Sequence, residues 1–426
     1  MFNGELPDEP SINFDISREN GYAPDATQWT NEIYVPYNLT ITSVDGSTDS
    51  AYNGSEYVCM VEHDYIEDAT ALWQNNKTLT SWNADLDALQ DGTRMFSESA
   101  LTNYDGQLNS LQYGEEMFRN CNLGSFNIDL PKLTNGYHMF FNNKANKTLT
   151  QFQGDLSSLI NGGYMFYGTG LSSFATDSLG NLENGDNMFE RSELVSFNYD
   201  LPSLKNANKM FLGSQKLSTL GPNLQGENID CNGLADCSSM LETTNVKEIY
   251  ANFDSVKSID NLFGTHAITV PVEKFHSSLS GIDVNTPTIF SNSILLTEYD
   301  ADMQNLQNGT MMFQNCSNLT TYQGKLDSLM NGTKMFYKTK IMSFTNNLPN
   351  LTTGTEMFTN CQFTTFNIEL PKLKYGTNMF EDCINLTHFI SDLSSLTDAT
   401  NMFSGCINLV EFNANMNSIT NINNVF

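Results

Sequence analysis

Residues 312–336 read MFQNCSNLTTYQGKLDSLMNGTKMF, and residues 357–380 read MFTNCQFTTFNIELPKLKYGTNMF. Each stretch begins and ends with a Met-Phe pair. Beyond residue 70 the pair recurs at Met95-Phe96, Met117-Phe118, Met139-Phe140, Met165-Phe166, Met188-Phe189, Met210-Phe211, Met312-Phe313, Met335-Phe336, Met357-Phe358, Met379-Phe380 and Met402-Phe403. The steps are 22, 22, 26, 23 and 22 residues in the first series and 23, 22, 22 and 23 in the second. The chain is therefore a repeat with a period of 22 to 23 residues.

Apolar residues hold fixed offsets inside each unit. After the pair at 117–118 they are Leu123, Phe126, Leu130 and Leu133. A unit of this length cannot bury its own apolar face, so neighbouring units must stack. The pattern predicts an α/β repeat solenoid of the leucine-rich-repeat type, with about 15 coils of stacked short parallel strands.

The strand of each coil is predicted at the alternating segment, such as 123–128. There Phe126 and Ile128 point inward while Ser125 and Asn127 point outward. The return segment carries Pro and Asn-Gly, which predict a tight turn or a 3₁₀ or short helical return that buries the next Met-Phe pair.

These units have the general form MFxxCxxLTxFxxxLPxLxxGTxMF and resemble the BspA-type leucine-rich repeats of bacterial surface proteins over roughly residues 70–426. The resemblance implies a solenoid scaffold used for adhesion to varied ligands. It does not assign a binding site, since one fold serves many functions.

The chain divides into four predicted segments: an acidic non-repeat segment (1–70), a first regular block (71–216), irregular repeats with loop insertions (217–310) and a second regular block (311–426). The first segment holds 14 acidic residues against one basic residue, Arg18. We expect it to cap the solenoid or to dock it to a larger assembly. The sequence stops two residues into a new coil, so we expect the apolar residues Phe412, Ile419 and Phe426 to be covered by a partner, by another copy or by further residues.

Composition excludes some functions. With 20 Lys+Arg against 49 Asp+Glu, the formal net charge is −29, which argues against binding to nucleic-acid phosphates. No apolar stretch is long enough to span a membrane, and the start MFNGELPDEP lacks the features of a secretory signal. We therefore expect a virion or extracellular surface location without membrane insertion.

Some residue types recur at the same position of successive units and resemble metal or catalytic sites, but a structural role explains them. Five cysteines lie four residues after the Met of their unit, where other units place Asn, Ser or Thr: Cys121, Cys316, Cys361, Cys383 and Cys406. We interpret this column as a small buried slot that bonds the turn backbone, and we expect no metal, no cofactor and no catalytic residue. An acidic column on the rim, which also contains Lys325, is interpreted as solvated rather than as a calcium ladder. His266 and His276 near Glu273 are a weaker candidate site.

The outward strand positions form a polar, mostly uncharged face of amides and hydroxyls. Such groups donate and accept hydrogen bonds and suit sugar hydroxyls or an extended protein surface; a face that only keeps the sheet soluble is the equal alternative. The candidate ligand-binding residues are Asn83, Asn103, Asp105, Asn127, Gln151, Gln153, Asn198, Gln323, Asn367, His388 and Asn413.

The first functional hypothesis is a non-enzymatic recognition solenoid of a bacteriophage virion or tail that binds host surface glycan or protein. The second is a bacterial BspA-like surface adhesin. The third is a glycan-degrading solenoid enzyme, which would need carboxylates converging on one groove, for instance among Glu227, Asp230, Asp236 and Glu242.

Overall fold

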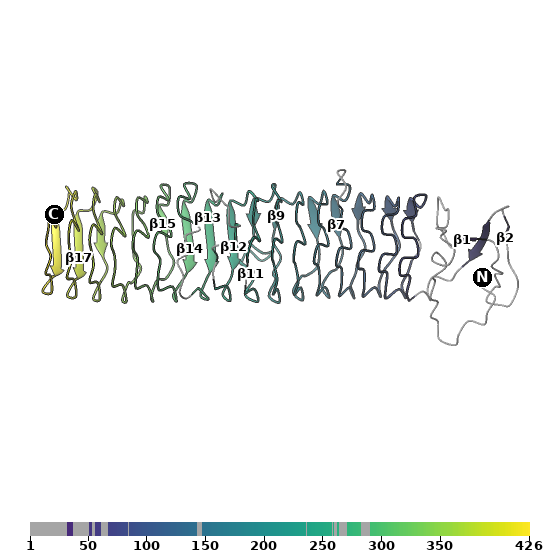
Figure 1. Cartoon of the computed structure of the whole chain (residues 1–426), viewed down its shortest axis with the longest axis horizontal. Helices are drawn as coiled ribbons and strands as arrows, with labels where there is room; N and C mark the ends of the chain where they lie inside the picture. Colours follow the sequence, from purple (N-terminus) through teal and green to yellow (C-terminus); the bar gives the residue numbers. More distant parts are fainter. Residues whose placement is uncertain are drawn as a thin grey trace. The chain divides into compact units, whose positions relative to one another are not determined.

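In the computed structural model, the described residues are 32–36, 51–52, 56–60, 67–83, 85–142, 147–235, 237–257, 259, 262–263, 271–282 and 290–426 (Figure 1). Two compact units are present: Met1–Val195 with Lys209–Lys216, and Ser196–Asn208 with Leu217–Phe426. The described coils form a parallel β-solenoid of about 14 turns, which confirms the predicted fold. The four sequence segments stay a prediction.

The first unit contains one antiparallel sheet and two parallel ones. Strands β1 (Glu32–Pro36), β2 (Ala51–Tyr52) and β3 (Glu56–Met60) pair in the order β1-β3-β2. The coils that follow contribute the parallel pair β4 (Ser81–Trp82) and β5 (Asn103–Tyr104) and the parallel sheet of β6 (Ser125–Phe126), β7 (Gln151–Gln153) and β8 (Ser173–Ala175).

The second unit contains two parallel sheets. The larger has the order β9 (Ser196–Phe197), β10 (Thr219–Leu220), β12 (Glu248–Asn252), β13 (Lys274–Ser278), β14 (Glu298–Asp302) and β15 (Thr321–Tyr322), and β11 (Ile229–Asp230) pairs with β12. The smaller contains β16 (Thr365–Asn367), β17 (His388–Asp392) and β18 (Glu411–Asn415).

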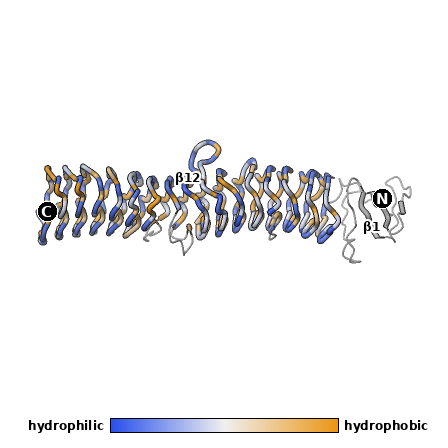
Figure 2. The backbone as a smooth tube through the Cα atoms, turned by 90° about the horizontal axis from the view of Figure 1, so that it is seen from above, coloured by the Kyte–Doolittle hydropathy of each residue, from blue (hydrophilic) through white to orange (hydrophobic). Residues whose placement is uncertain are grey.

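The Met-Phe pairs form the core of both units. In the first unit Phe118, Phe140 and Phe166 stack face to face, with ring centroids 5.5 and 5.4 Å apart. Strand aromatics such as Phe126 meet these rings edge to face, 4.9 Å from Phe140. Both arrangements are favoured by the ring quadrupole. Each contact joins a ring of one coil to a ring of the next, so it forms only when the coils stack. Figure 2 shows the resulting alternation of hydrophobic and hydrophilic segments along each turn.

Of the two predicted return geometries, the turn is the one present. The residue before each Met of a Met-Phe pair is left-handed, and so is the residue three after it in every pair but the one at Met139, as at Arg94 (φ 58°) and Glu98 (φ 61°) around Met95. A left-handed residue cannot continue an α-helix, so the return stays one turn long. Within the described residues there is no helix, and hence none that is apolar and long enough to cross a membrane.

The cysteine column is the small slot expected from the sequence. Cys383 donates its thiol hydrogen to the carbonyl oxygen of Phe358 (3.1 Å), and Cys121 does the same to Phe96 (3.0 Å). Ser214 occupies the same slot and bonds the Phe189 carbonyl (2.7 Å). From residue 67 on, the seven cysteines of the described residues form no disulfide.

Candidate functional site

The outward strand residues lie where the alternation places them. Ten of the eleven candidates are exposed and Asn198 is half-exposed. In the described residues, the side-chain amides of Asn127, Gln151, Gln153 and Asn367 form no hydrogen bond and so remain available to a ligand. Ligand binding by the eleven stays a prediction.

Strand register determines which candidates are neighbours. In the first unit, Gln151 on β7 lies between Ser125 and Ser173, and Asn103 on β5 bonds Asp105 of its own coil. In the second unit Asn367 and Asn413 flank Ile390, while His388 lies beside Glu411, 3.7 Å from its carboxylate. The candidates thus form short rows in each unit.

The strand face widens at β12, β13 and β14. Each has five residues, whereas the flanking strands β10 and β15 have two. Their inward residues Ile249, Phe275 and Tyr299 are fully buried and fix the register. The outward residues therefore align in rows across the sheet, one of which is Tyr250, His276 and Asp300.

A hollow of about 310 Å³ opens on this face, and we call it the β13 hollow. It is lined by Asn228, Tyr250, His276, Ser277, Ser278, Asp300 and Asp302. All seven belong to the second unit, and they combine one aromatic phenol, one imidazole, two carboxylates, an amide and two hydroxyls.

The two rings of the hollow are stacked. The Tyr250 and His276 ring centroids are 4.8 Å apart and the planes differ by 5°. His276 Nδ1 lies 3.8 Å from Asp300 Oδ2, and its Nε2 lies 3.9 Å from Glu298 Oε1. These distances are too long for hydrogen bonds, so both nitrogens can still bond a ligand.

The charges around the hollow differ in how they are paired. Asp302 bonds both the Nζ (2.9 Å) and the backbone N–H (3.0 Å) of Lys325. Lys274 pairs with Glu248 (3.4 Å). Burial, with the Glu248 carboxylate nearby, raises the pKa of Tyr250, so its hydroxyl stays protonated and can donate. Asp300 has no cation other than His276 beside it in the described part of the chain, so it is the hollow's open acceptor.

A family profile described as the BspA type leucine rich repeat region matches the chain in six copies, over residues 73–195, 238–353 and 332–426. The chain belongs to this BspA-type family. Among solved structures, it is similar to a leucine-rich repeat protein from Bacteroides ovatus, at 16% identity over 84% of this chain and 83% of that one, with a TM-score of 0.31. It is also similar to a leucine rich cell surface protein from Faecalibacterium prausnitzii, at 12% identity over 92% of this chain and 96% of that one, with a TM-score of 0.21. No curated protein matches it significantly.

Most residues that line the β13 hollow of this BspA-type chain were not among the candidates chosen from the sequence. The candidate outward residues run up to Asn198 and resume at Gln323, so the coils between these two residues contributed none. Yet Tyr250, His276 and Asp300 each directly follow the inward residue of their strand, which is the same offset as Asn127 after Phe126. Extending the column through the irregular repeats would have found them.

Two other sequence-based groupings are described only in part. Glu273 bonds Lys247 (2.8 Å) in the preceding coil, while His276 faces the hollow; His266 lies outside the described residues. Of the carboxylates considered for an enzyme, Asp230 lies on β11 and Glu242 in the turn after Met240-Leu241, and Asp236 lies outside the described residues. The described residues contain no group of three or more His, Cys, Asp or Glu placed to hold a metal ion.

Proposed function

We propose that this BspA-type chain is a non-enzymatic recognition protein of a bacterial cell surface. We propose further that it binds a glycan on the strand face of its second unit. The observation that carries the proposal is the β13 hollow, because it combines an aromatic pair with open donors and acceptors in one recess.

The chemistry of the hollow suits sugar hydroxyls. A carboxylate such as Asp300 can accept from two adjacent hydroxyls, and the phenol of Tyr250 and the amide of Asn228 can both donate and accept. A volume of about 310 Å³ is at the lower end of the range of small-ligand sites, which suits a group of monosaccharide size. Unbonded amides such as Gln323, which directly follows β15 in the coil next to β14, could extend the contact along a chain.

The bacterial surface location is favoured over the virion expected from the sequence. The family match supports it, because BspA-type repeats are those of bacterial surface proteins. The acidic charge is compatible with either origin, so it does not support the phage hypothesis in particular.

Glycan degradation is the second candidate, because Asp300 and Asp302 lie two residues apart on the outward face of β14, beside a histidine. Two carboxylates that flank a glycosidic bond could act as acid and base. Asp302 already pairs with Lys325, so it is not free to contact a glycosidic oxygen.

Partner contacts were expected at both ends of the chain, and we propose them for the assembled protein. In the last coils Ile407, Val410 and Phe426 are 80, 81 and 69% exposed. Burial of such side chains against a partner would be favourable, at roughly 25 cal/mol per Å². For the segment 1–70, we propose docking to a larger assembly.

The test uses the purified full chain with immobilised host-cell surface polysaccharide and with envelope extract, and it measures both retention and release of reducing ends. We expect retention without release. His276→Ala and Asp300→Asn should each weaken retention about tenfold, which is the loss of ~1.4 kcal/mol of contact. His388→Ala is the matched control, because His388 is also an outward strand histidine beside a carboxylate but lies away from the hollow.

Each outcome has a distinct meaning. Equal loss in the His276 and His388 variants would place binding on the wider strand face instead of the hollow. Release of reducing ends that Asp300→Asn abolishes would establish the enzyme and refute the non-enzymatic proposal. Retention only by protein components of the extract would refute a glycan ligand.

A further inference from the structure

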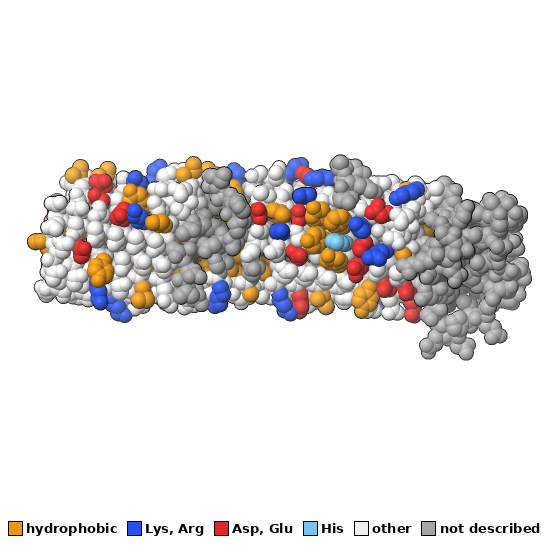
Figure 3. All heavy atoms as spheres, in the orientation of Figure 1, with side chains coloured by type: hydrophobic (Ala, Val, Ile, Leu, Met, Phe, Trp, Pro, Cys, Tyr) orange, Lys and Arg blue, Asp and Glu red, His pale blue; other side chains and the backbone are white. Residues whose placement is uncertain are grey.

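Five aromatic side chains gather on two neighbouring return turns of the first unit, away from the strands. We call them the aromatic patch: Tyr137, His138, Phe141, Tyr164 and Tyr167. All five are half-buried. Figure 3 shows the patch as a group of hydrophobic side chains around a histidine, bordered by acidic and basic residues.

The rings form one continuous cluster. Tyr137 stacks on His138 with centroids 4.1 Å apart, and Tyr164 meets the His138 ring edge to face at 4.9 Å. Phe141 stacks on Tyr167 at 4.6 Å, and His138 lies 4.9 Å from Phe141. The rings therefore support one another, and little side-chain freedom remains to be lost on binding.

The chain's own repeat shows that these positions do not require aromatic residues. The equivalent positions of the preceding coil hold Glu115, Glu116 and Arg119, and those of the following coil hold Asp186, Asn187 and Glu190. The buried Met-Phe pairs are the same in all of these coils. The rings are therefore not needed for the core.

Two of the rings even sit on unfavourable backbone. His138 (φ 56°) and Tyr164 (φ 55°) are left-handed, a conformation that asparagine tolerates better than bulky residues. Asn187, Asn378 and Asn401 fill the same position in some coils, and Arg94, Glu116 and Lys209 fill it in others. The bulky ring of Tyr164 suits this backbone less well than asparagine would, which points to a role outside folding.

The charged border of the patch is internally paired. Glu116 bonds Arg119 (2.9 Å) and Arg94 (3.2 Å), and Glu190 lies 3.5 Å from Arg191. The guanidinium groups of Arg119 and Arg191 lie over Phe141 and Tyr167, 5.6 and 5.7 Å from the ring centroids. The border thus offers polar groups without a strong net field, which favours an uncharged ligand.

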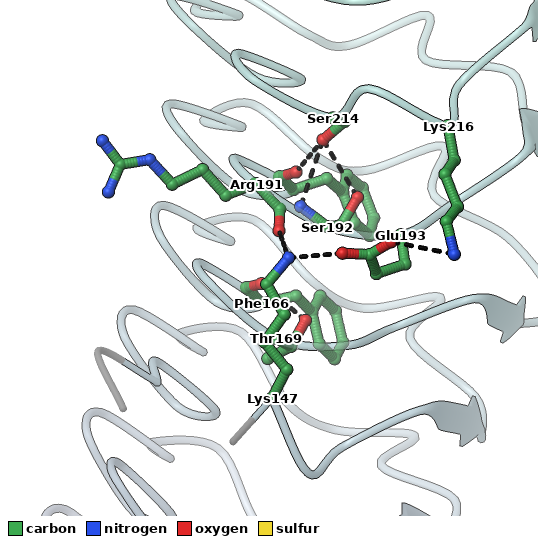
Figure 4. A network of polar contacts seen from close by, with 9 residues as sticks. Lys147, Phe166, Thr169, Arg191, Ser192, Glu193, Ser214 and Lys216 are labelled. Atoms are coloured by element: carbon green, nitrogen blue, oxygen red, sulfur yellow. Dashed lines mark hydrogen bonds and ion pairs between the residues drawn. The ribbon is translucent and has the colours of Figure 1, made fainter. Parts of the chain in front are cut away.

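One edge of the patch is held by the polar network of Figure 4. Lys147 Nζ donates to the Arg191 carbonyl (3.3 Å) and pairs with Glu193, which Lys216 also contacts (3.1 Å). In the same coils Ser192 and Ser214 bond each other (3.1 Å). The network fixes the backbone that carries Arg191, and so the guanidinium that borders Tyr167.

The size of the patch favours a small ligand over a protein. Five aromatic side chains of about 200 Å² each, none more than about a third exposed, present at most about 350 Å². A stable protein interface uses about 800 Å² per partner. Ring faces pack well against the C–H faces of sugar rings, while phenol and guanidinium groups at the border bond hydroxyls.

We propose that the aromatic patch is a binding platform for neutral saccharides, separate from the β13 hollow. The contacts that define it are the Tyr137–His138–Tyr164 cluster and the stacked pair Phe141–Tyr167. The proposal does not depend on the hollow, because the patch lies wholly in the first unit.

The test is affinity electrophoresis of the full chain through gels that contain galactomannan, xylan, mixed-linkage β-glucan or starch, with alginate as the anionic comparison. We expect at least one neutral polysaccharide to retard the wild type. Tyr164→Asn and Tyr167→Thr should lower that affinity at least tenfold. Tyr337→Thr is the matched control, since Tyr337 occupies the position of Tyr167 in another coil but lacks neighbouring aromatic rings among the described residues.

Thermal unfolding separates binding from folding. Tyr164→Asn should melt no lower than the wild type, because asparagine suits the left-handed position. Should a variant fail to fold, Tyr137→Thr tests the same cluster on ordinary backbone.

Retardation by alginate alone, retardation by none of the gels, or a loss of affinity in Tyr337→Thr as large as that in Tyr167→Thr would overturn the proposal. So would retardation that His276→Ala abolishes and Tyr164→Asn leaves intact, since that result would assign the saccharide to the hollow.

Discussion

The contact between glycine and methionine in successive coils gives the sharpest test of how the repeat is built. A Cβ added at Gly332 would lie 2.6 Å from the Met357 sulfur and 3.0 Å from its methyl carbon. Gly309 and Gly354 stand in the same relation to the methionines of their next coils, at 2.7 Å. Glycine in this column therefore makes room for the buried methionine, and Gly332→Ala must displace Met357.

The magnitude follows from two opposing effects. Overpacking of a buried site costs about 1–3 kcal/mol. The change also restricts the unfolded chain, which returns about 0.4–1 kcal/mol because Gly332 does not need left-handed backbone. Fully buried alanines at Ala69 and Ala207 hold the same column, so a coil can adapt to a methyl group. We expect a net loss of about 1–2 kcal/mol.

Urea unfolding measures the total loss, and native-state hydrogen exchange locates it. In a solenoid each coil contacts only its neighbours, so protection should fall at the amides that join these two coils, such as Phe336 N–H bonded to the Met357 carbonyl (2.9 Å). Gly124→Ala is the matched control, because a Cβ there meets nothing within 4 Å. In the double variant with Met357→Leu, the combined loss should be smaller than the sum of the single losses, since leucine is shorter and lacks the Sδ–Cε end that the added Cβ would meet. Gly332→Ala as stable as Gly124→Ala would refute the reasoning.

Three further predictions concern buried and paired groups. Cys383→Ser should change stability by less than about 0.5 kcal/mol, whereas Cys383→Val should cost about 0.5–1.5 kcal/mol, because valine removes one of the two hydrogen bonds that the Phe358 carbonyl accepts and leaves only the one from the Cys361 N–H (3.1 Å); urea midpoints decide this. Burial raises the pKa of Cys361 from its ordinary 9.0 to about 12, so Ellman's reagent at pH 8 should label it only after unfolding. Because the pKa of Cys361 is higher in the folded than in the unfolded chain, the buried neutral thiol contributes its full stability below pH 9, and this contribution is lost as the pH rises toward 12. The thermal midpoint should therefore fall between pH 9 and 11, and a midpoint that stays constant would contradict the prediction. Hydrogen bonds from Lys147 and Lys216 lower the pKa of Glu193. Glu193→Gln should therefore cost about 0.2–1 kcal/mol of unfolding free energy at pH 7. The cost should shrink as the pH falls below the ordinary carboxyl pKa, and urea unfolding at pH 7 and at a pH below that value measures the difference.

The sequence predicted the core because core positions repeat. Every coil needs the same inward residues, such as Phe126 and Phe118, and a one-residue shift would expose them, so the period and the alternation are visible in the sequence. The return geometry was less visible. Its left-handed positions hold Arg94, Glu116 and Lys209 as well as asparagine, and no common side chain marks them.

The candidate sites were harder to predict for the opposite reason. The exposed amide face was found because it follows the strand alternation, as at Asn127 and Gln153. The β13 hollow lies where the coil spacing changes and the Met-Phe pair is lost, so the column of Tyr250 and His276 was not followed there. The aromatic patch depends on side chains of adjacent coils meeting, and a single unit does not reveal that.

At both candidate sites the exposed residues differ from those at the same positions of other coils, while the buried residues remain the same in kind. Phe275 beneath the hollow and Phe140 beside the patch are as buried as their equivalents in regular coils. Since the core of a solenoid depends on inward residues and nearest neighbours, an outward residue can change at little cost in stability. Tyr164 goes further, because it keeps a bulky ring on backbone that suits asparagine. A stabilised Tyr164→Asn variant that no longer binds saccharide would show that the departure serves recognition; a destabilised one would show that the ring belongs to the fold.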